Sequence, residues 1–264
     1  MKKGENMKDN MKKCGNMKDN MKNGFIYIVL VMSMTVGVAY AWSNGPGGGY
    51  STDPNLPNIG THDLILNGAI NMLSADMKNQ IDITAADYGS EMPNYNETVC
   101  NCTYGIGDRG KHHVYYNSDG TVHDAIGAER AKAEYDLAVA NLSVGDKYNF
   151  SIHLGIMSHY IADVADYGHT MINESSDSNV EFEHYVNVNP DQFFNDTYIK
   201  FDGAYDNTTA YGATLAVAND TTFDNKFGDG IYTNTWMDTA MNSSSGPSYA
   251  FADVNFTNRT RQSL

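Results

Sequence analysis

The most constraining feature of the sequence is a long apolar segment, residues 146–164, that ends in two side chains suited to metal binding. Apolar residues recur in it at intervals of three and four, which predicts a helix with Ile152, Ile156, His159 and Asp163 on one face. Because positions four apart on a helix lie one above the other, His159 and Asp163 project the same way and can hold one metal ion. The same spacing also occurs on ordinary solvated helices, so the rest of the chain has to decide between the two interpretations.

Several other segments have the periodicity of helices. A helix is expected to begin at Thr61, acting as N-cap, and further helices are expected at 122–142, 179–186 and 209–218, with a weaker one at 231–241. Residues 83–119 are rich in Asn, Tyr, Gly and Asp and are expected to form a long loop, and loops of this length are usually either functional or disordered. No segment alternates convincingly as a strand would. The sequence therefore predicts an all-α, single-domain, multi-helix bundle.

Residues 1–41 are not expected to belong to that domain. They comprise a Lys-rich, low-complexity region followed by the apolar run Phe25–Ala41, which ends in Ala39-Tyr40-Ala41. This order is typical of a secretory signal with an Ala-x-Ala cleavage site, and cleavage there would make Trp42 the new N-terminus of a domain spanning 42–264. An uncleaved membrane anchor is the alternative, because 17 apolar residues lie at the lower edge of what spans a bilayer.

The charge of the expected mature domain is strongly negative. Residues 1–41 hold seven of the 17 basic residues and three of the 32 acidic ones, so the remainder carries a formal charge of −19. A surface this acidic repels nucleic acid and therefore disfavours a polymeric nucleic-acid partner. The same part contains many Asn-x-Ser/Thr acceptor sequences, which suit an exported glycoprotein; they include Asn96, Asn101, Asn141, Asn195, Asn207 and Asn255.

The cysteines do not form a recognisable framework. Cys14 would leave with the signal, and Cys100 and Cys102 remain, separated by one residue. A disulfide over so short a span is strained, and a metal site would need further ligands besides this pair. We interpret the two cysteines as a loop feature whose role stays open, with an oxidised pair favoured outside the cell.

The chain contains many nitrogen and oxygen ligands and no paired thiolates of the zinc-finger kind. Such ligands suit zinc in a hydrolytic site, and so large a set implies more than one ion. The candidate metal ligands, in chain order, are Trp42 as a new N-terminus, His62, Asp87, His113, His159, Asp163, His169 and Glu183. His112 could exchange roles with its neighbour His113, although the spacing to Gly120 favours His113.

Four local strings together resemble the bacterial zinc-dependent phospholipases C, whose all-α fold is shared with single-strand nucleases. The string His153-Leu-Gly-Ile-Met-Ser-His159-Tyr-Ile-Ala-Asp163-Val is similar to the central metal helix of the family. Ala85-Ala86-Asp87-Tyr88 resembles its loop aspartate, and His113-Val-Tyr-Tyr-Asn-Ser-Asp-Gly its loop histidine. The apolar helix after His62 resembles its N-terminal helix. The resemblance covers residues 42 to about 186, and implies a bundle with long metal-binding loops.

This resemblance implies two or three Zn²⁺ ions. The ligand plan assigns Asp87, His113, His159 and Asp163 to the first ion, and Trp42, His62 and a bridging Asp163 to the second. His169 and Glu183 would hold the third. The family completes the third site with a histidine four residues before the glutamate, where this chain has Asn179, a poor zinc ligand. Glu181 or His184 could substitute, or the third site could be empty.

The resemblance also implies an activity. It predicts an exported phosphoric diester hydrolase that acts on a phospholipid or another phosphodiester, with Asp87 as general base, possible contact with a membrane surface and no indicated oligomeric state. Choline-selective members have a glutamate and an aromatic residue where this chain has Gly45 and Gly110, and only Tyr88 of that cage is present, so a choline head group is not predicted. A nuclease or nucleotidase, and a zinc-binding surface protein without catalytic activity, are the alternatives.

Overall fold

The computed structural model describes residues 51, 53–94, 109–172, 182–183, 185–186, 189, 208–223 and 233–242. In this part of the chain 70% of the residues are helical and 4% are in strands, which confirms the predicted all-α class. The more specific prediction, a bundle of the zinc phospholipase C type, stays a prediction. The N-terminal segment 1–41, Trp42 and the Cys100/Cys102 pair lie outside the described residues.

The described secondary structure consists of seven α-helices, three short 3-10 helices and one hairpin. The α-helices are α2 (Thr61–Met72), α3 (Ala75–Lys78), α4 (Ile83–Glu91), α6 (Ile126–Ser143), α7 (Lys147–Asp163), α10 (Ala210–Phe223) and α11 (Thr233–Met241). The 3-10 helices are η2 (Met92–Asn94), η3 (Arg109–Lys111) and η4 (Tyr167–Thr170). Strands β1 (Tyr115–Tyr116) and β2 (Val122–Asp124) pair in antiparallel fashion.

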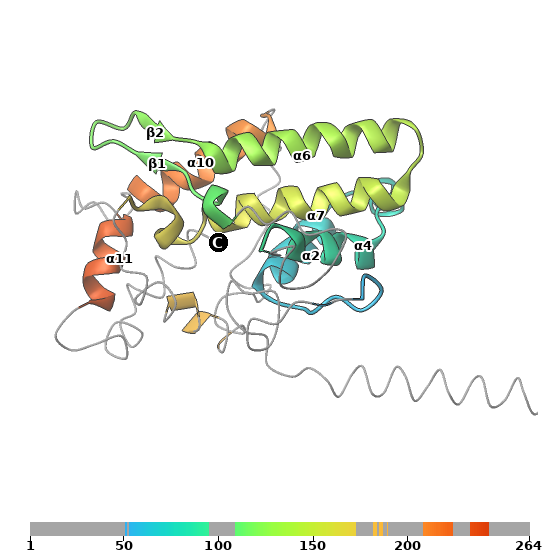
Figure 1. Cartoon of the computed structure of the whole chain (residues 1–264), viewed down its shortest axis with the longest axis horizontal. Helices are drawn as coiled ribbons and strands as arrows, with labels where there is room; N and C mark the ends of the chain where they lie inside the picture. Colours follow the sequence, from blue (N-terminus) through green and yellow to red (C-terminus); the bar gives the residue numbers. More distant parts are fainter. Residues whose placement is uncertain are drawn as a thin grey trace, which may run out of the picture. The chain divides into compact units, whose positions relative to one another are not determined.

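Helices α6 and α7 are the longest elements and lie side by side, as Figure 1 shows. The connection between them turns sharply at Gly145, whose φ of +75° is costly for residues with a side chain. Asp146 then caps α7 by accepting a hydrogen bond from the backbone N–H of Asn149. Ile152, Ile156 and Tyr160 of α7 are buried against α6 and α4, so the periodicity seen in the sequence reports a real packing face.

Helix α4 crosses α7 very closely because both helices have glycine at the crossing point. A Cβ atom placed on Gly89 would lie within 3.0 Å of the Ile152 carbonyl oxygen, and one on Gly155 would lie 2.8 Å from the Ser90 nitrogen and closer still to the Ala86 carbonyl. Only residues without a side chain allow this approach. The two glycines therefore set the position of α4 relative to α7.

Three sequence predictions about element boundaries are corrected by the structure. The long loop expected at 83–119 begins instead with helix α4, whose buried side chains include Ala85 and Tyr88. The helix expected from Val122 begins only at Ile126, because residues 122–124 pair with β1. The N-cap of α2 is Gly60 rather than Thr61; the Gly60 N–H donates to Asp63, and Thr61 is buried within the first turn.

The C-terminal half agrees with the sequence where the structure describes it. Helices α10 and α11 correspond to the segments predicted at 209–218 and 231–241, and α10 continues further than expected. The segment predicted at 179–186 contributes the buried side chains of Phe182 and Val186, which pack with Tyr167 and Met237. Among the described helices, none has the length and apolar character needed to cross a bilayer.

We predict opposite effects for two glycine-to-alanine substitutions. Gly155→Ala should lower the free energy of unfolding by about 3 kcal/mol, because the added methyl group meets the backbone of α4. Gly68→Ala, in the middle of α2, should raise it by about 0.5–1 kcal/mol, because no atom lies within 4 Å of the added Cβ and alanine favours the helix. Urea denaturation followed by circular dichroism measures both, and a Gly155→Ala protein as stable as the wild type would contradict the close crossing.

Candidate metal centre

The last turn of α7 presents His159 and Asp163 to the interior of the protein. Their relative exposures are 0% and 2%, and the His159 Nε2 atom lies 3.1 Å from Oδ2 of Asp163. The four-residue spacing on the helix produces this contact, as the sequence predicted. The pair is therefore a buried site and not a pair of solvated side chains.

The first turn of α2 adds His62 to this pair. Its ring stacks on the ring of His159 with 3.9 Å between centroids and 18° between planes, and its Nε2 atom is 3.4 Å from Oδ1 of Asp163. One ligand atom each from His62, His159 and Asp163 lies within 4.8 Å of the other two. We call these three residues the first ligand group.

The segment after η3 contributes His112, which the sequence analysis ranked below its neighbour. The Nδ1 atom of buried His112 lies 2.9 Å from Oδ2 of Asp163 and 3.4 Å from Nε2 of His159. The structure thereby corrects the prediction of His113, whose Nε2 is 3.2 Å from Asp124 and whose ring stacks on Tyr115. Neighbouring side chains of a non-helical segment point to different sides, so only one of the two histidines can face Asp163.

The backbone of α4 fixes the orientation of His159. The His159 Nδ1–H donates to the Ser90 carbonyl oxygen, with 2.5 Å between the two atoms. The Ser90 hydroxyl lies 2.5 Å from Oδ1 of Asp63 on α2, so the acceptor is itself held in place. With a proton on Nδ1, the His159 ring presents Nε2 to Asp163, which is how backbone carbonyls orient metal-binding histidines.

The charges in this cluster depend strongly on one another. Burial alone would raise the pKa of Asp163, but His159, His112, His169 and His62 surround the carboxylate and hold its pKa well below the usual value. Burial also lowers the pKa of His62 well below the usual value, and the adjacent His159 lowers it further. An ionised carboxylate therefore faces an imidazole that stays neutral, which is the protonation state that a metal ion requires of both.

A second ligand group follows directly along the chain. Asp166, His169 and Glu183 each offer an atom within 4.8 Å of the others, and His169 Nε2 lies 3.9 Å from Oδ1 of Asp163. Burial lowers the pKa of His169 to about 4, partly opposed by Asp163, so this ring is also neutral at physiological pH. His169 and Glu183 were predicted from the sequence, whereas Asp166 was not.

Asp166 combines two roles in its position after α7. It is fully buried, and its Oδ1 accepts a hydrogen bond from the Gly168 N–H at 3.0 Å, which caps η4. Glu181 and His184 are the candidate replacements for the histidine that is missing at Asn179, and these three residues lie outside the described part of the chain. The three-residue spacing between Asp163 and Asp166 was the available signal, but it extends past the end of the helix.

Asp87 lies in neither ligand group. It occupies a buried position on α4, and its Oδ1 accepts a hydrogen bond from Nδ2 of Asn67 on α2 at 3.0 Å. Burial raises the pKa of Asp87 to about 6, although the bond from Asn67 opposes the shift. A carboxyl group with this pKa can accept a proton near neutral pH. Asp87 was also predicted as a metal ligand, but its carboxylate oxygens belong to neither of the two ligand groups.

We predict that Asp166→Asn removes metal from the second group without unfolding η4. The amide oxygen can still accept from Gly168, but the negative charge that a cation needs is lost. After dialysis against zinc, metal analysis should show about one equivalent less per chain than in the wild type. Asp82→Asn makes the same change at the N-cap of α4 and should leave the metal content unchanged. Equal metal content in the Asp166→Asn and wild-type proteins would contradict the assignment.

No protein-family model matches the sequence, and no curated protein matches it either. The chemistry of the two ligand groups therefore has to be inferred from their own atoms, burial and charge.

Proposed function

We propose that the chain is an exported zinc-dependent phosphodiesterase that resembles the phospholipases C and hydrolyses a phosphate ester of a phospholipid. The observation that carries the proposal is the buried carboxylate of Asp163 with the imidazoles of His62, His112 and His159 gathered around it. The second group, beginning with Asp166, lies immediately beyond it along the chain.

The residues of the first group fit a divalent cation. Among the described residues, neither ring nitrogen of the buried His62 has a hydrogen-bond partner. Buried polar atoms normally find partners, so an imidazole of this kind next to a carboxylate indicates a ligand for an ion. The lone pair of His159 Nε2 faces a carboxylate oxygen at 3.1 Å, and two acceptors at this distance need a proton or a cation between them.

The ligand types favour zinc. Imidazole nitrogens with one or two carboxylates are the usual donors of catalytic zinc sites, and the first group offers two histidines and one aspartate within mutual reach. His112, at 2.9 Å from the same carboxylate, is available to complete the set. Zinc bound here would supply Lewis acidity, polarising a phosphoryl oxygen and making water acidic enough to act as a nucleophile at neutral pH.

The protein groups around this centre have distinct tasks in the proposed reaction. Asp163 can bridge the two groups, because His62 and His169 both face its Oδ1 while His159 faces Oδ2. Asp87, with its pKa of about 6, would accept the proton of the attacking water. Ser90 holds the ring of His159 in place through its carbonyl and takes no part in the chemistry.

The N-terminal segment and the net charge of the sequence support the proposed substrate class and location. The predicted signal segment places the domain outside the cell or tethers it to a membrane, where phospholipids are accessible. The charge of −19 that the expected mature domain carries disfavours nucleic-acid polymers, so a nuclease or nucleotidase is the second candidate. A zinc-binding surface protein without catalytic activity is the third, since Asn179 replaces the histidine that the family uses.

The proposal predicts at least two zinc ions per chain and hydrolysis of a generic phosphodiester. Protein beginning at Trp42 would be analysed for metal and assayed with bis-p-nitrophenyl phosphate, before and after chelation. We expect chelation to abolish turnover and added zinc to restore it. Metal without turnover would support the non-catalytic alternative, and faster cleavage of single-stranded DNA than of phosphatidyl substrates would support the nuclease alternative.

The Asp87→Asn substitution should affect catalysis and stability in opposite directions. Hydrolysis should fall by orders of magnitude while zinc content stays close to that of the wild type. Because the folded-state pKa of Asp87 is raised to about 6, its ionisation destabilises the metal-free fold as pH rises from about 4 through 6. The variant should therefore be more stable than the wild type by on the order of 2 kcal/mol at pH 7.5 in EDTA, with little difference at pH 4. Unchanged turnover would refute the role of Asp87 as base.

A further inference from the structure

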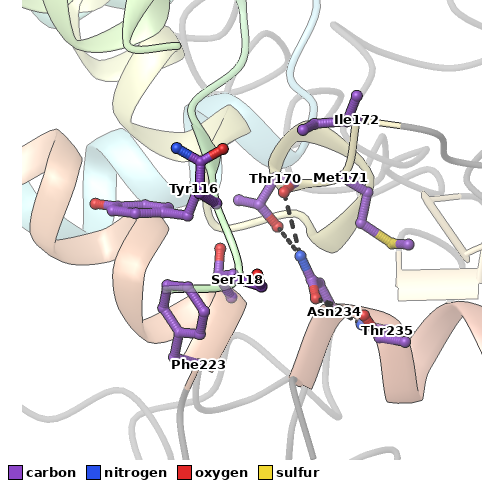
Figure 2. A pocket seen from close by; sticks show the side chains of 10 residues that line it. Tyr116, Ser118, Thr170, Met171, Ile172, Phe223, Asn234 and Thr235 are labelled. Atoms are coloured by element: carbon purple, nitrogen blue, oxygen red, sulfur yellow. Dashed lines mark hydrogen bonds between the residues drawn. The ribbon is translucent and has the colours of Figure 1, made fainter. Parts of the chain in front are cut away.

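A pocket of ≈ 270 Å³ adjoins the end of η4, the 3-10 helix that carries His169, and Figure 2 shows its walls. The walls come from four places: residues 116–118 of the hairpin, residues 170–172 after η4, the end of α10 and the start of α11. A pocket of this size suits one small ring or polyol, since pockets for drug-sized ligands occupy roughly 300–1,000 Å³.

The pocket and the second ligand group share the segment of η4, which hydrogen bonds hold in place. Thr170, which lines it, directly follows His169, and the Asn234 amide donates to the Thr170 carbonyl at 3.1 Å and to its hydroxyl at 3.3 Å (Figure 2). The Val114 N–H donates to the His169 carbonyl, so the strand that leads to Tyr116 is held against the same segment. The pocket wall and His169 therefore belong to one hydrogen-bonded segment of the chain.

The described residues of the pocket walls are neutral. None of the ten described residues that line the pocket is an acid, a lysine, an arginine or a histidine. Hydroxyl and amide groups come from residues such as Ser118, Thr170 and Asn234, while the rings of Tyr116 and Phe223 pack edge to face with centroids 5.4 Å apart. Hydroxyl and amide groups beside aromatic rings suit a ligand with several hydroxyls and apolar C–H faces. A quaternary ammonium would instead require an aromatic cage or a carboxylate.

We propose that this pocket binds the neutral, hydroxyl-bearing alcohol portion of the substrate, a polyol or sugar ring. The inference rests on the proposed phosphodiesterase function, because it places the phosphate of the same molecule at the ligand groups. It names a substrate class that the sequence analysis, having set choline aside, left open.

Binding is tested without catalysis by saturation-transfer NMR of the full protein with millimolar myo-inositol or choline. We expect transfer to inositol and none to choline. Thr235→Trp, which fills the pocket from α11, should abolish the inositol signal, whereas Thr239→Trp, at an exposed position one turn later, should preserve it. Phe223→Leu, a milder change, should weaken inositol binding at least fivefold. Transfer to choline, no transfer to inositol, or insensitivity to both pocket variants would overturn the proposal.

A hydrolysis experiment tests the polyol pocket separately from the proposed phosphodiesterase activity. The kcat/KM for glycerophosphoinositol should exceed that for glycerophosphocholine at least tenfold. Thr235→Trp should reduce this ratio, whereas Thr239→Trp, outside the pocket, should leave both the ratio and the cleavage of bis-p-nitrophenyl phosphate unchanged. Cleavage of the generic substrate with equal kcat/KM for the two natural diesters would overturn the pocket assignment while leaving the phosphodiesterase standing. Inositol binding without any hydrolysis would overturn the phosphodiesterase while leaving the pocket as a polyol site.

Discussion

The close crossing of α4 and α7 is the contact on which the candidate site depends. Gly89 and Gly155 let the two backbones approach to a distance that any side chain would prevent. That approach brings the Ser90 carbonyl to His159, fixes which ring nitrogen carries the proton, and directs the other at Asp163. A packing constraint between two helices thus determines which ring nitrogen of His159 faces Asp163, and the geometry of the centre follows from it.

Asp163 is the electrostatic counterpart of this constraint. It lies at the end of α7, where the chain leaves the helix, and imidazoles approach both of its oxygens: His62 and His169 on one side, His112 and His159 on the other. Burial penalises its charge, so the surrounding imidazoles or a bound metal ion must offset that penalty. One carboxylate shared by two ligand groups explains why the groups lie close together along the chain.

The sequence predicted the parts of the site that depend on periodicity and failed where local register or packing decides. The spacing of His159 and Asp163 on a strongly apolar helix was sufficient to predict their contact. Helix α4 was not predicted because it contains Gly89, and glycine disfavours helices. The reason for this glycine is visible only in the structure, where α4 crosses α7 closely at Gly89 and Gly155. The choice of His112 depends on which way a non-helical segment faces. Asp166 caps η4, and only the proximity of Glu183 in the folded protein identifies it as a candidate ligand.

Burying these polar side chains without a metal ion costs free energy, and this cost bears on function. Burial and the stacked ring of His159, 3.9 Å away, hold the pKa of His62 well below its usual value, so the ring stays neutral and, among the described residues, its two buried nitrogens have no hydrogen-bond partner. A bound cation would supply a partner and would also join the first turn of α2 to the last turn of α7. Metal affinity and folding stability are therefore coupled, so part of the binding free energy appears as stability of the fold. The burial that makes these side chains costly alone also keeps them preorganised, which is what a catalytic metal centre requires.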